Sequence, residues 1–337
     1  TNTAVYIGTV ESTVKSLTFK NCSFIGNIFS SAYAGGFTGQ INMHIGDICF
    51  ENCTVGADGL NFTISGNGRV AGFVAKTLAV DNTSAIYLTF KNCVNFANIT
   101  GAGDTASAVG SLVGRVNRTN VYVDNCTNYG YIFSESTKNT RGVGGLIGEV
   151  IYNCNVNITS STNNGDINVV AAVPGGLIGI SSYRSYVTIG ALKEVEAAAP
   201  ASETAEGDAT VEEKTYVVDE TKACVNNGDI NQTNDWAYGS GGIIGFVKSN
   251  SKKDLMTEES TPNEVRVYGA VNNGNITTAL SNVGGIVGMT DDSAKNVALL
   301  EVRGCVNNGD LLATGGNNVG GMGGQIPGTV VNIIDCT

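Results

Sequence analysis

The feature that most constrains the fold of this chain is an internal repeat. A small residue, usually Cys, opens each copy, and a Gly-Gly-apolar-apolar-Gly signature follows the first eight of these anchor residues by 13 to 18 residues. Self-similarity at a nearly fixed period is typical of solenoids and propellers, in which one supersecondary unit packs against the next. The anchors are Cys22, Cys53, Cys93, Cys126, Ser161, Cys224, Ala270, Cys305 and Cys336, at intervals of 31 to 63 residues.

A short alternating pattern precedes every anchor except Cys224. An apolar residue, any residue and a second apolar residue stand before the anchor at 17–19, 48–50, 88–90, 121–123, 156–158, 265–267, 300–302 and 331–333. Alternation of period two with β-branched and aromatic residues predicts a strand whose middle residue faces water. Each copy then has about three short strands, separated by turns rich in Gly and Asn.

Stacking of such copies predicts an all-β fold, a parallel β-helix of about eight coils. Four Pro and 45 Gly leave little room for long helices. A propeller is the rival, but it needs four antiparallel strands in each blade of roughly 40–45 residues, and most copies here are shorter. We therefore expect residues 1–337 to form one β-solenoid, with residues 188–223 as a long acidic insertion.

One asparagine recurs two residues after the anchor. In stacked coils these side chains lie one above another, and their amides can hydrogen-bond along the axis of the rod. A ladder of ligand contacts is the alternative, and we favour the structural ladder. The asparagines are Asn95, Asn128, Asn163, Asn226, Asn272 and Asn307.

The nine cysteines are predicted to be mostly unpaired. Seven of them are anchors, and Ser161 and Ala270 at the same position show that a small residue suffices there. Buried free Cys behaves as a small hydrophobe, although anchors in adjacent coils are near enough for a disulfide with local adjustment. Cys49 falls at an outward strand position, and Cys154 has no assigned place in the repeat.

The net charge of −11 is unevenly distributed. Residues 188–223 contain nine acidic and three basic residues, which predicts a solvated loop or an extruded hairpin with residues 216–218 as its returning strand. The rest of the rod is mildly acidic and shows no basic stripe in the sequence. We therefore expect no nucleic-acid partner.

The chain carries ten Asn-x-Ser/Thr sequons, which are candidates for N-linked glycans. With a polar, glycine-rich composition that is only 15% charged, they favour an extracellular or cell-surface location. The candidates are Asn21, Asn52, Asn61, Asn82, Asn98, Asn117, Asn125, Asn157, Asn231 and Asn275.

No signal peptide, lipidation motif or apolar run of transmembrane length occurs in these residues. The repeats begin at Thr1 and stop after Cys336 without a polar cap, whereas solenoids usually cap their terminal coils. We expect this to be a section of a longer chain that associates with itself end to end or along a filament.

Catalytic motifs are absent from the sequence, and we expect neither an enzyme nor a cofactor. The single histidine, His44, has no partner at a recognisable spacing. Asp166, Asp229 and Asp310 recur five residues after their anchors. An interrupted carboxylate row that binds Ca²⁺ is the functional reading of these aspartates, and turn residues are the alternative that we favour.

The repeat resembles a known family. Gly-Gly-Leu-Ile-Gly at 144–148 and 175–179 and Val-Gly-Gly-Ile-Val-Gly at 283–288, each downstream of an Asn-rich turn, are similar to the GLUG-type repeats of microbial surface proteins and, more generally, to pectin-lyase-like right-handed β-helices. This resemblance implies an adhesive or scaffolding solenoid and transfers no catalytic residue.

Three functions remain open from the sequence. The favoured one is a structural extracellular glycoprotein, a repeat section of a surface filament, appendage or stalk. The second is an adhesin that binds glycans or another cell-surface ligand along the face of the rod, through exposed Tyr or Trp such as Trp236. The third is a polysaccharide-active enzyme.

Overall fold

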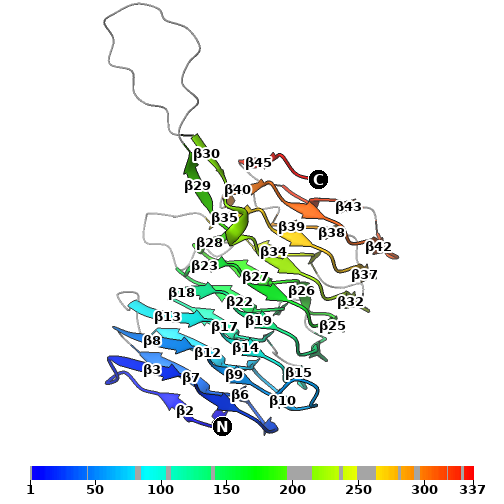
Figure 1. Ribbon diagram of the computed structural model, residues 1–337. Coiled ribbons are helices and arrows are strands. Elements are labelled where there is room, and N and C mark those ends of the chain that lie inside the picture. Colours follow the sequence, from blue (N-terminus) through cyan, green and yellow to red (C-terminus); the bar gives the residue numbers. More distant parts are fainter. Residues whose placement is uncertain are drawn as a thin grey trace, which may run out of the picture.

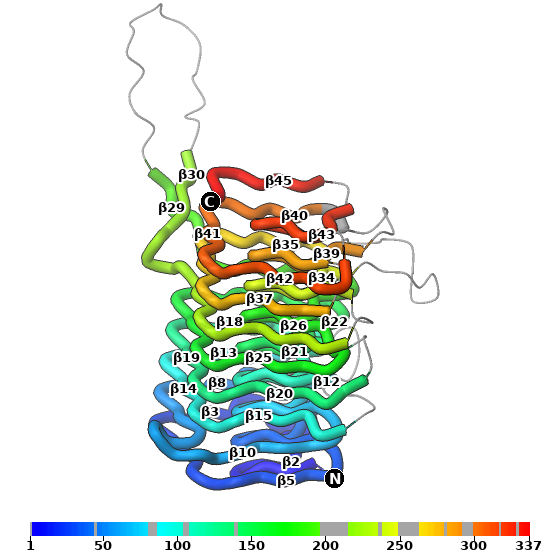
Figure 2. Tube along the Cα trace, turned by 90° about the vertical axis from the view of Figure 1, so that its right-hand side faces the viewer, coloured from blue at the N-terminus to red at the C-terminus, as the bar shows by residue number. Residues whose placement is uncertain are grey.

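The coils of this chain stack into a parallel β-solenoid. The structure, a computed structural model, describes residues 2–43, 45–79, 85–103, 108–137, 141–195, 215–234, 238–248, 263–279, 282–291, 297–316, 318–327 and 330–337. Five parallel sheets of eight or nine strands run along the rod, and each coil adds one strand to each sheet (Figure 1). From the side, the coils appear as regular rungs from one end to the other (Figure 2). The predicted all-β solenoid is confirmed, and the parallel pairing excludes a propeller.

We name the sheets A to E in the order in which a coil visits them. Sheet A comprises β1 (Asn2–Ala4), β6 (Tyr33–Gly35), β11 (Val70–Ala71), β16 (Val109–Gly110), β21 (Gly142–Gly144), β26 (Val173–Gly175), β33 (Ser240–Gly241), β38 (Asn282–Gly284) and β43 (Asn318–Gly320). Sheet B comprises β2 (Ile7–Val10), β7 (Thr38–Met43), β12 (Val74–Ala79), β17 (Val113–Asn117), β22 (Ile147–Ile151), β27 (Ile178–Ser182), β34 (Ile244–Lys248), β39 (Val287–Thr290) and β44 (Gly323–Gln325).

The other three sheets complete each coil. Sheet C comprises β3 (Ser16–Lys20), β8 (Ile45–Glu51), β13 (Ala85–Lys91), β18 (Thr119–Asp124), β23 (Asn155–Thr159), β28 (Tyr186–Ile189), β35 (Asn263–Tyr268), β40 (Val297–Arg303) and β45 (Val331–Ile334). Sheet D comprises β4 (Ser23–Phe24), β9 (Thr54–Val55), β14 (Val94–Asn95), β19 (Thr127–Asn128), β24 (Thr162–Asn163), β31 (Val225–Asn226), β36 (Val271–Asn272) and β41 (Val306–Asn307). Sheet E comprises β5 (Ile28–Ser30), β10 (Thr63–Gly66), β15 (Asn98–Gly101), β20 (Ile132–Ser134), β25 (Ile167–Val169), β32 (Ile230–Gln232), β37 (Ile276–Thr278) and β42 (Leu311–Ala313).

The prediction of about three strands per coil is wrong, because a complete coil has five. The alternating pattern before the anchor is the strand of sheet C, as predicted. Two-residue segments such as Val225–Asn226, which resemble turns in the sequence, pair in parallel with the same segment of the adjacent coils. Such a segment is a strand only because it pairs with the adjacent coils, and a local sequence pattern does not show this pairing.

The glycine signature forms the sharp corner between sheets A and B. Its first glycine ends the strand of sheet A, and sheet B begins three residues later. A Cβ atom at Gly144 would lie 2.0 Å from the carbonyl oxygen of Ile147, and one at Gly145 would lie 2.0 Å from that of Gly176. Only glycine allows the backbone to approach itself and the next coil this closely.

Stacked side chains fill the interior of the rod. In the N-terminal coils, Phe19, Phe50 and Phe90 form one column with centroid separations of 4.9 and 5.0 Å. Phe37 and Phe73 form a second column, 5.1 Å apart, that meets the first edge to face. Branched aliphatic residues continue the core in later coils. Each fully buried side chain of this size contributes roughly 1.5–3 kcal/mol.

The corner between sheets C and D has a left-handed backbone in each coil that the structure describes. Asparagine tolerates this region better than other residues with a Cβ, and glycine tolerates it best. The φ angles lie between 50° and 77° at Asn21, Asn52, Asn92, Asn125, Ser160, Gly190, Gly269, Gly304 and Asp335.

The alternating pattern that is missing directly before Cys224 occurs earlier in the chain, in β28 (Tyr186–Ile189), because the insertion separates this strand from its anchor. Residues 187–189 pair with β23 and β35, so the insertion begins at Gly190 rather than at residue 188. Its described ends form an antiparallel hairpin of β29 (Leu192–Val195) and β30 (Thr215–Val218), followed by the 3₁₀ turn Glu220–Lys222. The predicted returning strand at 216–218 lies within β30.

The hairpin lies beside the C-terminal coils (Figure 1). A Cβ atom at Gly269 would lie 2.6 Å from Cγ1 of Val218, and one at Gly304 would lie 2.9 Å from Cγ2 of the same side chain. The two corner glycines therefore leave space for one valine methyl group each, and Val218 fastens the base of the hairpin to the rod.

Candidate functional site

The six predicted asparagines form one continuous buried column on sheet D. Each Nδ2 donates to the Oδ1 of the next asparagine at 2.7–2.8 Å, from Asn95 to Asn307. Each Nδ2 also donates to the carbonyl oxygen two residues further on, at 2.8–3.0 Å. Both amide hydrogens are thus used within the rod, which assigns the column to the structure rather than to a ligand.

The amide column begins at Asn95. Its Oδ1 is buried without a hydrogen-bond partner, because the preceding coil has Val55 at the same position. The second glycine of the signature packs on this column, since a Cβ at Gly242 would lie 2.4 Å from Cγ of Asn272. The position of Asn272 in the column therefore requires a glycine at residue 242.

The anchor cysteines form a second inward column, and all nine thiols are free in the structure. Sγ of Cys305 donates to the carbonyl oxygen of Val267 in the preceding coil at 3.4 Å, and Cys53 and Cys224 make the equivalent bond at 3.3 and 3.4 Å. Burial raises the pKa of the Cys53 and Cys224 thiols to about 11 and that of Cys305 to about 12. These thiols remain protonated and unreactive at neutral pH.

The remaining anchors and cysteines occupy different surroundings. Cys93 and Cys126 are fully buried, whereas Cys22 and Cys336 are half-buried. Cys154, which the sequence did not place, lies in the turn between sheets B and C and donates to the carbonyl oxygen of Ile151 at 3.1 Å.

The sequon asparagines differ in accessibility. Asn117 is only 7% exposed, so this packing leaves no room for an oligosaccharide on it, and Asn82 lies outside the described residues. The other eight are exposed or half-buried, at Asn21, Asn52, Asn61, Asn98, Asn125, Asn157, Asn231 and Asn275. Asn21, Asn52 and Asn125 form an exposed ladder together with Asn92, with amide bonds of 2.8–3.1 Å.

The aspartate row accepts backbone hydrogen bonds. Oδ1 of Asp166 accepts from the amide of Asp229 at 2.9 Å, and Oδ1 of Asp229 accepts from that of Asn275 at 2.8 Å. These carboxylates tie one coil to the next. No group of three or more His, Cys, Asp or Glu in the described part of the chain is arranged to hold a metal ion, and His44 lies outside that part.

The functional candidate lies where the outer faces of sheets A and B meet. The residue directly after the last position of each signature, a glycine in every copy except Ala75, points away from the core on sheet B, and register places these residues in one column. We call this face the A/B groove, after the cavity in its middle. Its sheet B column reads Gln40, Lys76, Arg115, Glu149, Ile180, Phe246, Met289 and Gln325.

A buried ion cluster occupies the middle of the A/B groove. Glu149 is 2% exposed. Arg115 donates from Nε to its Oε2 at 2.5 Å, the amide of Gly142 donates to its Oε1 at 3.2 Å, and Nη1 of Arg141 lies 3.8 Å from Oε1. Both carboxylate oxygens are therefore engaged, and two guanidinium groups share one negative charge.

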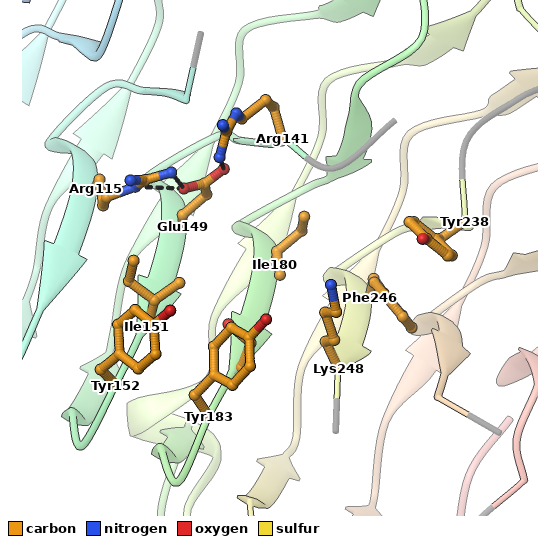
Figure 3. A pocket seen from close by; sticks show the side chains of 11 residues that line it. Arg115, Arg141, Glu149, Ile151, Tyr152, Ile180, Tyr183, Tyr238, Phe246 and Lys248 are labelled. Carbon is orange, nitrogen blue, oxygen red and sulfur yellow. Dashed lines mark hydrogen bonds and ion pairs between the residues drawn. The ribbon is translucent and has the colours of Figure 1, made fainter. Parts of the chain in front are cut away.

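A cavity of about 220 Å³ adjoins this cluster on its C-terminal side (Figure 3). Tyr152 and Tyr183 stack at 4.7 Å on one side, and Tyr238 and Phe246 stack at 4.8 Å on the other. Nζ of Lys248 lies 5.9 Å from the rings of both Tyr183 and Tyr238. The cavity thus offers aromatic walls and a cation, with Arg141 and Glu149 at its edge.

The N-terminal part of the groove holds two further cations. The guanidinium carbon of Arg69 lies 5.5 Å from the ring centroid of Tyr33, and Nζ of Lys76 lies 5.3 Å from it. Nη1 of Arg69 also donates to the Tyr33 hydroxyl at 3.5 Å. Within the described ranges, no carboxylate forms an ion pair with Arg69 or Lys76.

Cations that lie far apart in the sequence lie close together on this face. Lys76 and Arg115 are 39 residues apart in the sequence but adjacent in sheet B. Each column residue follows the last position of its signature, which is Ala75 for Lys76 and a glycine for the others, so a comparison of charges down the repeat, rather than along the chain, predicts this pair. Trp236, a candidate sugar contact, lies outside the described residues.

Comparisons with known proteins add no family. The chain matches no protein-family model, and searches of curated proteins and of solved structures find no match. In the described part of the chain, no helix is long and apolar enough to cross a membrane.

Proposed function

We propose that this chain is a rigid section of an extracellular or cell-surface protein whose A/B groove binds glycans. The observation that carries the proposal is the cavity of about 220 Å³, which the stacked rings of Tyr152 and Tyr183 line beside Lys248. Ligand sites are usually concave and largely apolar, with a few polar groups that fix orientation. Aromatic rings with a polar tip suit a ligand that has both apolar C–H faces and hydroxyl groups.

The remainder of the rod fits a scaffold. Its core is continuous, the amide donors and the thiols of its inner columns find partners within the rod, and its repeat resembles the GLUG-type repeats of microbial surface proteins. N-linked glycans on the exposed sequons and coaxial association of sections in a filament belong to the same proposal. Electron microscopy of native material that contains only isolated, capped monomers would contradict the filament.

A binding role fits the groove better than catalysis. Glu149 is the only carboxylate among the described residues that line the cavity, and hydrogen bonds and ion pairs hold both of its oxygens. A general base or nucleophile needs a free oxygen directed at the substrate. A sugar-release assay tests this part, and hydrolysis or elimination of a bound polysaccharide would overturn it.

A glycan array tests the binding function. We expect saturable binding of the purified chain to a subset of glycans, and we expect Tyr183→Ala to weaken that binding about tenfold or more, since a stacked ring contributes roughly 1–2 kcal/mol. The matched control is Tyr129→Ala, because Tyr129 is 53% exposed and stacks with Phe96 outside the groove. Absence of binding to any glycan, or equal losses in both variants, would reject the groove as the site.

Glycosylation is tested separately. Intact-mass analysis before and after enzymatic deglycosylation of the native protein should show a mass loss, and peptide mapping should place the glycans on exposed sequons and not on Asn117. An unchanged mass would remove N-linked glycans from the proposal.

A further inference from the structure

Cations gather in the A/B groove of an otherwise acidic chain. The whole chain has a net charge of −11 with 19 Lys and Arg. Arg69, Lys76, Arg115, Arg141 and Lys248 all lie along this one face, and the described part of the groove sets only Glu149 against them. A single-sign cluster on a surface of opposite overall charge attracts ligands of the opposite sign.

The surplus charge is greatest at the N-terminal end of the groove. Glu149 is shared by Arg115 and Arg141, whereas Arg69 and Lys76 both lie against the ring of Tyr33 and contact no described carboxylate. Within the described ranges, the guanidinium group of Arg69 makes one side-chain hydrogen bond, from Nη1 to the Tyr33 hydroxyl. A guanidinium group in this state has donors available for an anionic oxygen.

The directions of the pKa shifts at Arg69 and Lys76 agree with this geometry. Burial lowers the pKa of Arg69, and the neighbouring charge of Arg115 lowers it further. Burial also lowers the pKa of Lys76, and the charges of Arg69 and Arg115 act in the same direction. Half-buried cations that repel one another gain most from a bound counter-ion.

We infer that Arg69, Lys76 and Arg115 form an anion subsite that holds an acidic group, a carboxylate or a sulfate ester, of the glycan bound in the groove. This inference rests on the proposed function. Lys76, Arg115 and Glu149 occupy three adjacent strands, so the subsite lies within about 10 Å of the ion cluster along sheet B. One extended glycan along the rod can therefore place an acidic group on Arg69 and Lys76 and a ring between the aromatic pairs of the cavity.

The test compares three polysaccharides, one sulfated, one uronate-rich and one neutral, in calorimetric titrations at low and physiological salt. The variant Arg69→Gln/Lys76→Gln removes two charges and keeps a polar, somewhat shorter side chain at each position. Its control, Lys20→Gln/Lys91→Gln, removes the same charge from exposed positions on sheet C. We expect an acidic polysaccharide to bind the native chain most tightly, and the groove variant to lose about tenfold or more in affinity while the control changes less than about twofold.

The outcomes separate the inference from the function on which it rests. Tyr183-dependent binding that is equal for neutral and acidic glycans, and unaffected by the groove variant, would overturn the anion subsite and leave glycan binding in place. If only the sulfated or only the uronate-rich polysaccharide binds with dependence on Arg69 and Lys76, the subsite is upheld and its preferred acidic group is identified.

Two further measurements cover the other cases. If no glycan binds, the melting temperature in sodium sulfate against sodium chloride at equal ionic strength tests the subsite alone, and a sulfate-specific rise that the groove variant lacks would uphold it. An equal response in both proteins would overturn it. An oligonucleotide that binds more tightly than any polysaccharide would also overturn the inference, because the carrier of the acidic group would then be a nucleic acid.

Discussion

At the residue scale, two asparagine columns in this rod are close neighbours in sequence but differ in burial. Asn226 is fully buried and uses both hydrogens of its amide, one along the axis and one within its own coil. Asn227 points outward, donates to Asn164 of the preceding coil at 2.8 Å and accepts from Asn273 of the next coil at 2.7 Å. Unmade hydrogen bonds are expensive only where water cannot replace the partner, so the inner column should carry most of the stability.

Replacing Asn226 by Asp tests this difference. The aspartate retains an acceptor for Asn163 but loses both donated hydrogen bonds and buries a charge, and we expect a loss of about 3 kcal/mol in the free energy of unfolding. Asn227→Asp, on the adjacent exposed residue, should cost less than about 1 kcal/mol. Urea denaturation of both variants is the measurement, and equal losses would contradict a stabilising role specific to the inner column.

The cysteine column makes a second prediction. Because burial raises the pKa of the thiols at Cys53, Cys154 and Cys224 to about 11, we expect them to resist a neutral alkylating reagent at pH 8. Mass spectrometry of the native protein should find modification only at Cys22, Cys49 and Cys336, which are half-buried.

Unfolding provides the control for this experiment. Denaturation without a reducing agent should expose all nine thiols to the reagent. A smaller number would mean that disulfides link neighbouring anchors.

At the element scale, the repeat predicted some elements well and others poorly. The strand before the anchor was predictable because its alternation of apolar and polar residues reflects one buried and one exposed face, and the asparagine column was predictable because one residue type recurs at a fixed offset. The two-residue strands were not predicted, because they are defined by hydrogen bonds to the adjacent coil and not by a pattern in their own sequence.

The A/B groove was missed for a related reason. Its column changes from Lys76 to Glu149 to Phe246, so no residue type marks the column from coil to coil. Tyr152 and Tyr183 lie in turns of left-handed backbone, which the repeat pattern does not align. The proposed binding groove lies where the repeat varies, and the structural columns lie where it is constant.

The hairpin is an element whose attachment can be broken at a single position. Gly304→Ala places a Cβ 2.9 Å from Cγ2 of Val218, and the left-handed backbone adds a cost of roughly 1 kcal/mol. We expect Gly304→Ala to destabilise the protein and to increase proteolysis of the insertion at residues 190–223.

A double-mutant cycle separates the two causes. Val218→Ala removes the methyl groups that the new Cβ would meet, so Gly304→Ala should cost less in that background, by the part that is steric. A cost that is the same in both backgrounds would show that Val218 does not sit between the corner glycines.

At the scale of the whole molecule, each coil contacts mainly its two neighbours, and a complete coil should be removable. Deletion of residues 94–126 joins Cys93 to Thr127, which follows an anchor in the same way as Val94. In the shortened chain Lys76 lies next to Glu149, which is the position that Arg115 has in the native chain. We expect this shortened chain to fold, with β circular dichroism per residue unchanged and a cooperative thermal transition at a moderately lower temperature.

The control is a deletion out of phase with the repeat. Removal of residues 94–109 joins Cys93 to Gly110 and takes away strands of sheets D and E together with part of sheet A, so that later coils lose register. This variant should be unfolded or insoluble. Equal folding of the two variants would mean that the coils are not independent stacking units.

All five sheets direct their interstrand hydrogen bonds along the long axis, and this orientation has a mechanical consequence. A pull on the two ends loads one rung of bonds at a time, as in a zipper, rather than many bonds in shear. Release of one 33-residue coil would lengthen the molecule by roughly 110 Å. A tether built from such coils would yield to tension in repeated steps, each absorbing work, and would remain connected long after its first rung had opened.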